Sequence, residues 1–311
     1  MSSITLKSPS SQLAISVPNL TFSFNRQSTE VLHGINLELE RGSRCLLIGA
    51  NGAGKSTLLQ ILAGKRMTKS DVNVLGQNVF FSTPQGVTYL GTEWASNSVV
   101  RSDLVVSYFL DSVGGYRHKE RRDKLLDILD VDLDWHMHQI SDGERRRVQI
   151  VQGLMAPWTL LLLDEVTVDL DVMVRQELLE FLVEDAKMRN STIIYATHIY
   201  DGLNNFPTHV CHLQLGSTTP HCPIRWPIPT PTPKVYDGIP TSALEEIRSP
   251  ERIGSSLLIV ALHWLKEDRE LRLKLEAEGR ASFKKRGALE ESSVPTDSEM
   301  FYRKYDYSNN M

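Results

Sequence analysis

The stretch Gly-Ala-Asn-Gly-Ala-Gly-Lys-Ser, residues 49–56, is the most informative part of this 311-residue sequence. It follows an apolar, strand-like run that ends at Ile48 and it opens a helical pattern, which is the context that a phosphate-binding loop requires. Gly49, Gly52 and Gly54 allow tight turns in which successive amides point at phosphate oxygens, and the helix N-terminus adds favourable dipole charge. The stretch therefore predicts a phosphate-binding loop between a strand and a helix.

The residues of this loop have separate expected tasks. Lys55 is expected to reach the outer phosphates of a nucleotide and to assist catalysis there, and Ser56 is expected to ligate Mg2+. The sequence thus predicts ATP and Mg2+ as ligands. The expected nucleotide-binding residues of this segment are Gly49, Ala50, Asn51, Gly52, Ala53, Gly54, Lys55, Ser56 and Thr57.

An acidic pair, Asp164 and Glu165, directly follows the apolar run Leu160–Leu163. Acids at the carboxyl end of a central strand lie where ligands bind in open α/β sheets. Asp164 is expected to hold Mg2+, and Glu165 to polarise the attacking water, because phosphoryl transfer needs an aligned nucleophile. His198, at the end of the run Ile193–Thr197, is a third candidate catalytic residue. A purely structural histidine at a strand end is the alternative.

The chain alternates strand-like runs and helical patterns from Leu13 to about Gly216, which predicts a mainly parallel sheet covered by helices. The strand-like runs are Arg44–Ile48, Gly86–Leu90, Leu160–Leu163 and Thr192–Ala196. Ahead of them, Ala14–Phe24 and Val31–Leu39 alternate apolar and polar residues, as an antiparallel sheet with one face in water would. The α/β class therefore includes an antiparallel β subdomain.

Three regions are expected along the chain. Residues 1–12 are a Ser-rich, disordered tail, and residues 13–217 form the nucleotide-binding domain, with a helical subdomain at about 99–158. Residues 218–311 combine a Pro-rich linker, an amphipathic helix and a disordered tail, because the prolines remove too many amide donors for a helix or a central strand.

Composition argues against several classes of protein. The chain has 34 Lys and Arg, 38 Asp and Glu and a pI near 6.2, so direct nucleic-acid binding is not expected. Basic stretches such as Arg145–Arg147 are interpreted as solvated faces, with an RNA-contacting surface as the alternative. The three cysteines lack the spacing of a zinc site. No apolar segment reaches the length of a spanning helix, so a soluble, cytoplasmic protein is expected, with the nucleus as a second compartment.

One more segment lies between the loop and the acidic pair. Ile140–Glu144 reads Ile-Ser-Asp-Gly-Glu and precedes a helical run, Arg145–Leu154, whose N-terminus could bind an anion. With it, the order of motifs resembles the ATP-binding cassette (ABC) ATPases over about residues 14–216. In that family a phosphate loop, a glutamine loop, a signature loop, an acidic strand, a loop ending in Leu-Asp and a switch histidine follow one another. The matching positions are Gly49–Ser56, Ile140–Glu144, Asp164 and Glu165, Leu170 and Asp171, and His198.

The resemblance implies an ATPase that works as a dimer. Family members pair head to tail, so Ser141 and Gly143 of one chain are expected to close on ATP held by the other. Asp171 is expected to lie across that interface, and His198 to contact the γ-phosphate. Phe24 matches the aromatic residue on which adenine stacks. One cassette per chain implies a homodimer or a dimer with another cassette chain.

Departures from the family pattern concern the signature and the glutamine loop. Asp142 stands where the family has the first signature glycine, and a carboxylate there would repel the partner's γ-phosphate unless it is turned away or offset. The segment that aligns with the glutamine loop, Val87–Trp94, has no glutamine and leaves Thr92 or Glu93 for that contact. Smaller departures are Glu144 for a glutamine, and Val166 and Asp169 for proline and glycine.

A narrower resemblance concerns the role of the cassette. The Ile-Ser-Asp-Gly-Glu signature, the segment Tyr89–Trp94 and the C-terminal extension look most like the soluble eukaryotic cassette ATPases associated with the Ccr-Not transcription and mRNA-decay complex. This likeness implies a regulatory role with Ccr-Not subunits as partners. The alternative is a separate ATP-hydrolysing subunit of a multi-chain membrane transporter. A scaffold that binds ATP without hydrolysing it is disfavoured, because both Lys55 and Glu165 are present.

Overall fold

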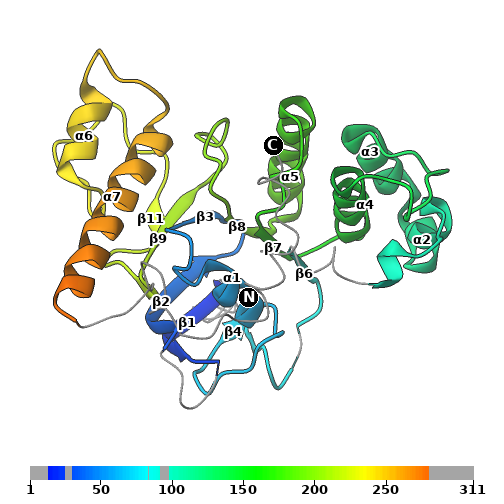
Figure 1. Ribbon diagram of the computed structural model, residues 1–311, viewed down its shortest axis with the longest axis horizontal. Coiled ribbons are helices and arrows are strands. Elements are labelled where there is room, and N and C mark those ends of the chain that lie inside the picture. Colours follow the sequence, from blue (N-terminus) through cyan, green and yellow to red (C-terminus); the bar gives the residue numbers. More distant parts are fainter. Residues whose placement is uncertain (1–12, 25–29, 83, 92–97, 280–311) are drawn as a thin grey trace, which may run out of the picture. The chain divides into compact units, whose positions relative to one another are not determined.

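The computed structural model describes residues 13–24, 30–82, 84–91 and 98–279 (Figure 1). The chain divides after Arg269 into two units, and the first of them contains both sheets. The expected tails at residues 1–12 and beyond residue 279 lie outside the described residues.

The central sheet is mainly parallel, as the sequence predicts. Its strands follow the order β10-β9-β3-β8-β7-β6, in which β9, β3, β8, β7 and β6 are parallel neighbours, and β10 and β11 pair antiparallel with β9. The strands are β3 (Arg44–Ile48), β6 (Val87–Leu90), β7 (Leu160–Asp164), β8 (Thr192–Ala196), β9 (His209–Gln214), β10 (Ser217–Thr218) and β11 (Ile224–Arg225). In β3, Leu46 and Ile48 enter one core, and Cys45 and Leu47 enter another on the opposite face. Both faces are therefore buried, which explains why these strands read as continuous apolar runs.

The second sheet is antiparallel, again as predicted. Its order is β2-β1-β4-β5, with β1 (Leu13–Phe22), β2 (Leu32–Glu40), β4 (Asn73–Val74) and β5 (Gln77–Asn78). Along β2 the buried residues Ile35, Leu37 and Leu39 alternate with the exposed Asn36 and Glu38. One face packs on the core and the other meets water, so the period of two in the sequence is preserved in the structure.

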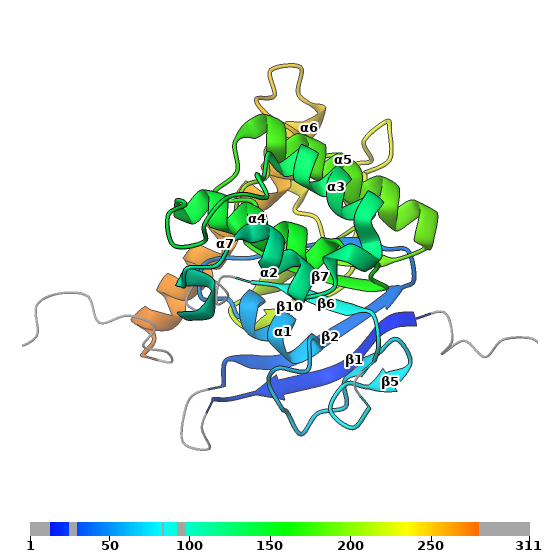
Figure 2. The same ribbon diagram turned by 90° about the vertical axis from the view of Figure 1, so that its right-hand side faces the viewer.

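The helices cover the central sheet on both sides (Figure 2). Helix α1 shares one core with both sheets, while α2 to α5 share the core of the opposite face. Leu125, Leu126 and Leu129 of α3 are buried there. The helices are α1 (Lys55–Leu62), η3 (Ser98–Arg101), α2 (Val106–Ser112), η4 (Gly115–His118), α3 (Lys119–Leu129), α4 (Asp142–Leu154), α5 (Val172–Arg189), α6 (Thr241–Arg248) and α7 (Ser256–Ala277).

The Pro-rich segment after β10 packs on the cassette, whereas the sequence suggests a linker. Ile224, Trp226 and Ile228 are buried in the same core as α4 and α5. Strand β11 pairs with β9, with Ile224 opposite Val210, and the Trp226 amide donates to the Thr208 carbonyl at 2.8 Å. An extended chain places alternate side chains on one face, so residues between the prolines can reach the core. Proline is tolerated at a sheet edge, because an edge strand needs fewer backbone N–H donors than a central strand.

Helix α7 is held on β9 by a buried polar cluster. His212 Nε2 lies 3.0 Å from Asp268 Oδ1, and the Gln214 amide donates to the same oxygen at 2.9 Å. The indole of Trp264 stacks on the His212 ring with centroids 4.7 Å apart. Polar groups that are buried and paired in this way fix the position of the helix, because separating them leaves a charge without a partner. Figure 1 shows α6 and the part of α7 that belongs to the first unit beside β9 and β11.

Trp264→Ala is expected to destabilise the whole cassette by about 3–5 kcal/mol, because it removes a large side chain from a packed core. Trp264 is 2% exposed, whereas Leu262 on the same helix is 45% exposed and provides the control, Leu262→Ala. The free energy of unfolding in urea is the measurement. A loss below about 1 kcal/mol for Trp264→Ala would mean that α7 does not contribute to the core, since changes at exposed sites stay near ±0.5 kcal/mol.

Candidate active site

The phosphate loop lies between β3 and α1, and its glycines are required by its conformation. Gly52 and Gly54 have φ of 83° and 95°, in the left-handed region that side chains disfavour. At Gly49 a Cβ atom would lie 2.4 Å from the Leu213 carbonyl oxygen of β9. Helix α1 has no side-chain cap at its N-terminus. Its first amides are therefore available to an anion.

Lys55 turns back over its own loop. Its Nζ donates to the carbonyls of Gly49 at 2.8 Å and Ala50 at 3.1 Å. Burial lowers the pKa of Lys55, and the carboxylates of Glu165 and Asp164 oppose that shift. These two hydrogen bonds hold the Lys55 ammonium group at the phosphate loop, where it is expected to bind the outer phosphates.

Ser56 and Asp164, both predicted as Mg2+ ligands, meet in the structure. Ser56 Oγ donates to Asp164 Oδ1 at 3.0 Å. Burial raises the pKa of Asp164, while hydrogen bonds from Ser56 and Tyr89 oppose the shift. A hydroxyl and a carboxylate oxygen at this spacing suit a hard cation such as Mg2+. Tyr89, whose hydroxyl lies 3.3 Å from Asp164 Oδ2, is a site residue that the sequence reasoning did not single out.

Glu165 and His198 also meet. His198 Nδ1 lies 2.8 Å from Glu165 Oε2, and the His198 amide donates to the same oxygen at 3.4 Å. Glu165 has φ of 53°, and its amide is held by the Ala196 carbonyl at 2.9 Å. A left-handed backbone at a residue other than glycine costs about 1–2 kcal/mol. Such strain is typical of functional sites.

Arg146 of α4 is another residue at the site that the sequence does not identify. Arg145 and Arg146 are 7% and 6% exposed, so the interpretation of Arg145–Arg147 as a solvated face fails for them. The Arg146 guanidinium donates to the carbonyls of Gly91 at 2.8 Å and Glu165 at 3.2 Å. It therefore joins α4 to the residue that follows β6 and to the acidic pair. The acceptors of these hydrogen bonds are backbone carbonyls distant from Arg146 in the sequence, so no local pattern predicts the contacts.

The signature segment caps α4, which begins at Asp142 instead of Arg145 as expected. Ser141 Oγ accepts from the Glu144 amide at 3.2 Å, and Glu144 Oε2 accepts from the Ser141 amide at 2.8 Å, a reciprocal capping box. The pattern Ser-x-x-Glu could have predicted this start. Hydrogen bonds from Ser141 lower the pKa of Glu144. The Asp142 carboxylate pairs with Arg145 and lies 3.8 Å from Arg101.

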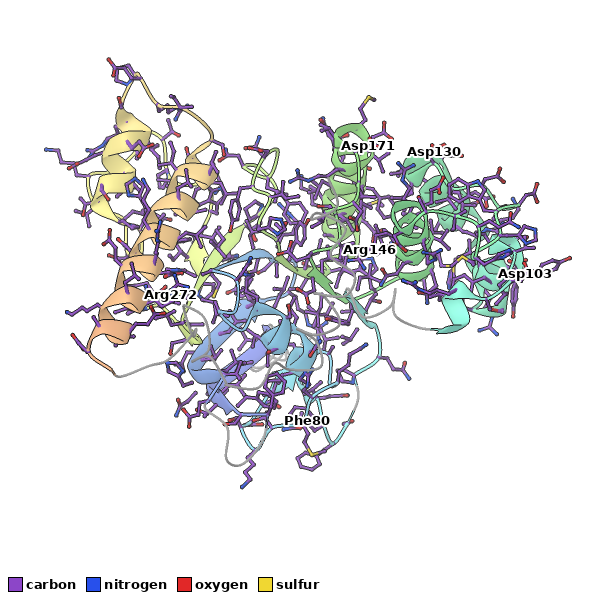
Figure 3. The ribbon with its side chains drawn as sticks, in the orientation of Figure 1. Phe80, Asp103, Asp130, Arg146, Asp171 and Arg272 are labelled. Carbon is purple, nitrogen blue, oxygen red and sulfur yellow. The ribbon has the colours of Figure 1, made fainter. Side chains whose placement is uncertain are left out.

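Asp171 is tied to the signature helix by Arg147. The Arg147 guanidinium lies 3.0 Å from Asp171 and 3.4 Å from Asp130. Figure 3 labels these two aspartates, which lie at the start of α5 and at the end of α3. Asp171 also caps α5 by accepting from the Val174 amide at 3.0 Å. A Cβ atom at Gly143 would lie 3.6 Å from the Asp169 carbonyl. The segment after the acidic pair and the start of α4 thus form one surface.

Phe24 is half exposed and has a cation on its ring. The Arg66 guanidinium lies 4.8 Å from the ring centroid, and Phe22 packs edge-on at 5.4 Å. A flat ring that is 51% exposed and carries a planar guanidinium can stack on a nucleotide base. Thr92 and Glu93, which the sequence suggests for the glutamine-loop contact, lie outside the described residues.

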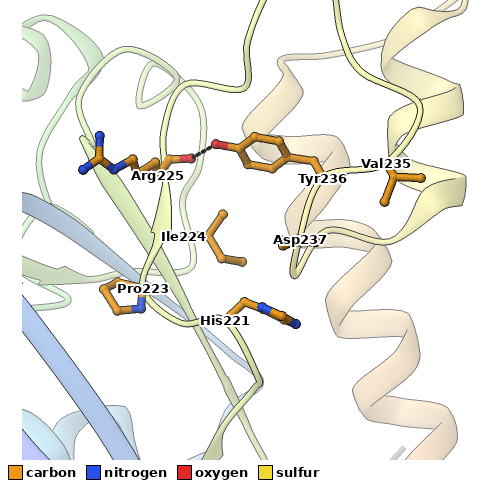
Figure 4. Close-up of a pocket in the computed structure, with 7 residues that line it drawn as sticks. All are labelled: His221, Pro223, Ile224, Arg225, Val235, Tyr236 and Asp237. Carbon is orange, nitrogen blue, oxygen red and sulfur yellow. Dashed lines mark hydrogen bonds between the residues drawn. The ribbon is translucent and has the colours of Figure 1, made fainter.

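A pocket of about 450 Å³ lies elsewhere, beside β11 (Figure 4). Its wall includes Arg225 and Tyr236, and the Tyr236 hydroxyl donates to the Arg225 carbonyl at 3.1 Å. None of its lining residues belongs to the phosphate loop, the acidic pair or the signature. The pocket is therefore separate from the candidate active site.

Comparison with known proteins agrees with this geometry. A family model described as ABC transporter matches residues 32–168. CCR4-associated factor 16 of Saccharomyces cerevisiae is 46% identical over 66% of this chain and 77% of its own. ABC transporter I family member 21 of Arabidopsis thaliana is also 46% identical, over 65% of this chain and 76% of its own. The structure of cbiO1 from Clostridium perfringens, part of the ABC transporter complex cbiONQ, matches with a TM-score of 0.53 and 25% identity over 67% of this chain and 87% of its own.

The chain belongs to the ABC transporter family. Within that family it is an ATP-binding cassette, an ATPase domain with the two sheets and the covering helices described above. Among the described residues, no helix is both long enough and apolar enough to span a membrane.

Proposed function

We propose that this chain binds Mg2+ and ATP at the loop of residues 49–57 and hydrolyses ATP as one half of a cassette dimer. The observation that carries the proposal is a set of contacts at the carboxyl ends of neighbouring strands. Ser56 is bonded to Asp164, and the next residue, Glu165, contacts His198. The proposed phosphate, metal and water sites would thus be adjacent, as an in-line displacement requires.

The roles of the residues follow from their chemistry. Ser56 and Asp164 would hold Mg2+, which neutralises charge on the outer phosphates. Lys55 would donate to those phosphates in place of its own loop carbonyls. Glu165 would polarise the attacking water, and His198 would orient Glu165 and the γ-phosphate. Phe24 would stack on adenine, and the backbone from Gly49 to Thr57 would bind the phosphates through its amides.

The signature belongs to the other half of the dimer in this proposal. Ser141 and Gly143 lie at the N-terminus of α4, and Ser141 is exposed. That helix end carries positive dipole charge and would face the γ-phosphate held by a second cassette chain. Asp171, joined to α4 by Arg147, would lie at the same interface. The partner is a second copy or another cassette.

We propose that the ATPase acts in transcription or mRNA metabolism with Ccr-Not subunits, in the cytoplasm and the nucleus. The likeness to CCR4-associated factor 16 supports this role by its name. The free thiols of Cys45, Cys211 and Cys222 are consistent with a reducing compartment. The acidic net charge of −4 and the pairing of Arg145–Arg147 within the chain favour protein partners over nucleic acid.

A transporter subunit is the second candidate, favoured by the match to cbiO1, a component of a transporter complex. The two candidates differ in what the full-length chain binds. Purification of tagged chain from cytosol and from detergent-solubilised membranes, with ATP or ADP, distinguishes them. Ccr-Not subunits in the cytosolic fraction support the regulatory role. Integral membrane proteins in equal amount with the chain, and no Ccr-Not subunits, would replace it with the transporter role.

A further inference from the structure

Asp103, His136 and His138 form a surface cluster in the segments that precede α2 and α4. His136 Nδ1 lies 2.8 Å and His138 Nδ1 3.1 Å from the same oxygen, Asp103 Oδ1. The two imidazoles meet edge to face, with centroids 5.7 Å apart. Figure 3 places Asp103 well away from Arg146, which touches the acidic pair. The cluster is therefore distinct from the candidate active site.

The backbone brings the three side chains to one face. Val105 and His136 form an antiparallel bridge, with the Val106 amide bonded to the Trp135 carbonyl at 2.8 Å. Residues 137–139 form a turn, in which the Gln139 amide donates to the His136 carbonyl at 2.9 Å. The bridge and this turn together bring both imidazoles to Asp103.

The residue between the histidines anchors them. Met137 is fully buried, and its amide donates to the Leu104 carbonyl at 2.8 Å. Its carbonyl accepts from the buried guanidinium of Arg145 at 2.9 Å. Beyond it, Gln139 lies 3.1 Å from His138 Nε2, which leaves Nδ1 as the nitrogen turned to Asp103. A core side chain thus fixes the positions of two surface imidazoles.

We propose that Asp103, His136 and His138 bind a divalent transition-metal ion, with Zn2+ as the ion that fits best. The three ligand atoms lie within 4.8 Å of one another. Around tetrahedral Zn2+, ligand atoms at about 2.1 Å from the metal stand about 3.4 Å apart. The present distances of 2.8 and 3.1 Å are shorter than that spacing by about 0.6 and about 0.3 Å.

The chemistry of the ligands selects the ion. Imidazole suits Zn2+ and its neighbours, whereas Mg2+ prefers oxygen ligands alone. The side chains are 42%, 37% and 73% exposed for His136, His138 and Asp103, so water can complete the coordination. This metal site is additional to the proposed Mg2+ site at Ser56 and Asp164.

Calorimetric titration of the untagged, full-length chain with Zn2+, in the presence of Mg2+ and ADP, tests the proposal. We expect one Zn2+ per chain, and a loss of affinity of at least about tenfold in His136→Ala and in His138→Ala. The matched control is His263→Ala, which removes a histidine that lies 2.8 Å from Glu246; within the described part of the chain no second histidine joins that pair. The control should bind Zn2+ like the unsubstituted chain, and circular dichroism should show that all variants are folded.

Co2+ provides a second readout that reports the ligand type. Visible absorption bands without a near-ultraviolet thiolate band would fit nitrogen and oxygen ligands. A thiolate band would assign the metal to the cysteines and overturn the proposal, because soft sulfur ligands mark a different site. Equal Zn2+ affinity in the unsubstituted chain and in the double variant His136→Ala/His138→Ala would overturn it as well.

Discussion

Glu165→Gln is expected to reduce steady-state ATP turnover by about 10²–10⁴-fold, the usual contribution of a positioned acid–base group. Glutamine keeps the size of the side chain and can still contact His198, which lies 2.8 Å from the Glu165 carboxylate. It removes the negative charge that would polarise water. ATP binding should persist, because Lys55 and the Ser56–Asp164 contact are unchanged. Phosphate release and equilibrium nucleotide binding are the two measurements.

The matched control is Glu177→Gln, the same change at an exposed position of α5. It should turn over ATP like the unsubstituted chain. Turnover of Glu165→Gln within twofold of the unsubstituted rate would exclude Glu165 from the chemistry. Loss of ATP binding as well as turnover would instead indicate that the substitution disturbs β7.

Asp142→Gly is expected to strengthen the ATP-dependent dimer by up to about tenfold, since a carboxylate at the signature would face the partner's γ-phosphate. The ion pair with Arg145 and the nearby Arg101 offset part of that charge. The Asp142 side chain is 78% exposed, so solvent screens it further and keeps the effect moderate. Sedimentation velocity with ATP, on chains that also carry Glu165→Gln, measures the dimer.

The same substitution should lower the stability of the monomer. Asp142 lies in the first turn of α4, where an acid interacts favourably with the helix dipole, and glycine is a poor helix former. Asp142→Asn separates the two effects, because it removes the charge without the flexibility of glycine. A stronger dimer with glycine but not with asparagine would rule out charge as the cause, and an unchanged dimer with both would show that Asp142 points away from the interface.

The sequence predicts the parts of this fold that depend on local patterns. Arg44–Ile48 and Thr192–Ala196 have the same bounds in sequence and structure, because strands buried on both faces are continuous apolar runs. The contacts of Ser56 with Asp164 and of Glu165 with His198 follow from strand ends that meet at one edge of the sheet. The positions of these residues along the chain are therefore enough to predict the two contacts.

Other features depend on partners that are distant in sequence. Arg146 lies in a run of charges that suggests solvent, and its burial is explained by backbone carbonyls distant in sequence, among them those of Gly91 and Glu165. Trp226 lies among prolines that suggest a linker, and it is buried in the core shared with α4 and α5. Tyr89 reaches Asp164 from the neighbouring strand. Such residues become visible only when tertiary packing is known.

The C-terminal extension affects how the chain can associate with other molecules. Residues 218–269 belong to the first unit and share its core, so α6 and the part of α7 up to Arg269 present side chains in fixed positions. A flexible linker would lose conformational entropy on binding, at a cost of several kcal/mol. A preformed surface avoids most of that cost. Binding of another molecule to the surface formed by α6 and this part of α7 would therefore resemble rigid docking. Its heat-capacity change would be less negative than that of coupled folding and binding.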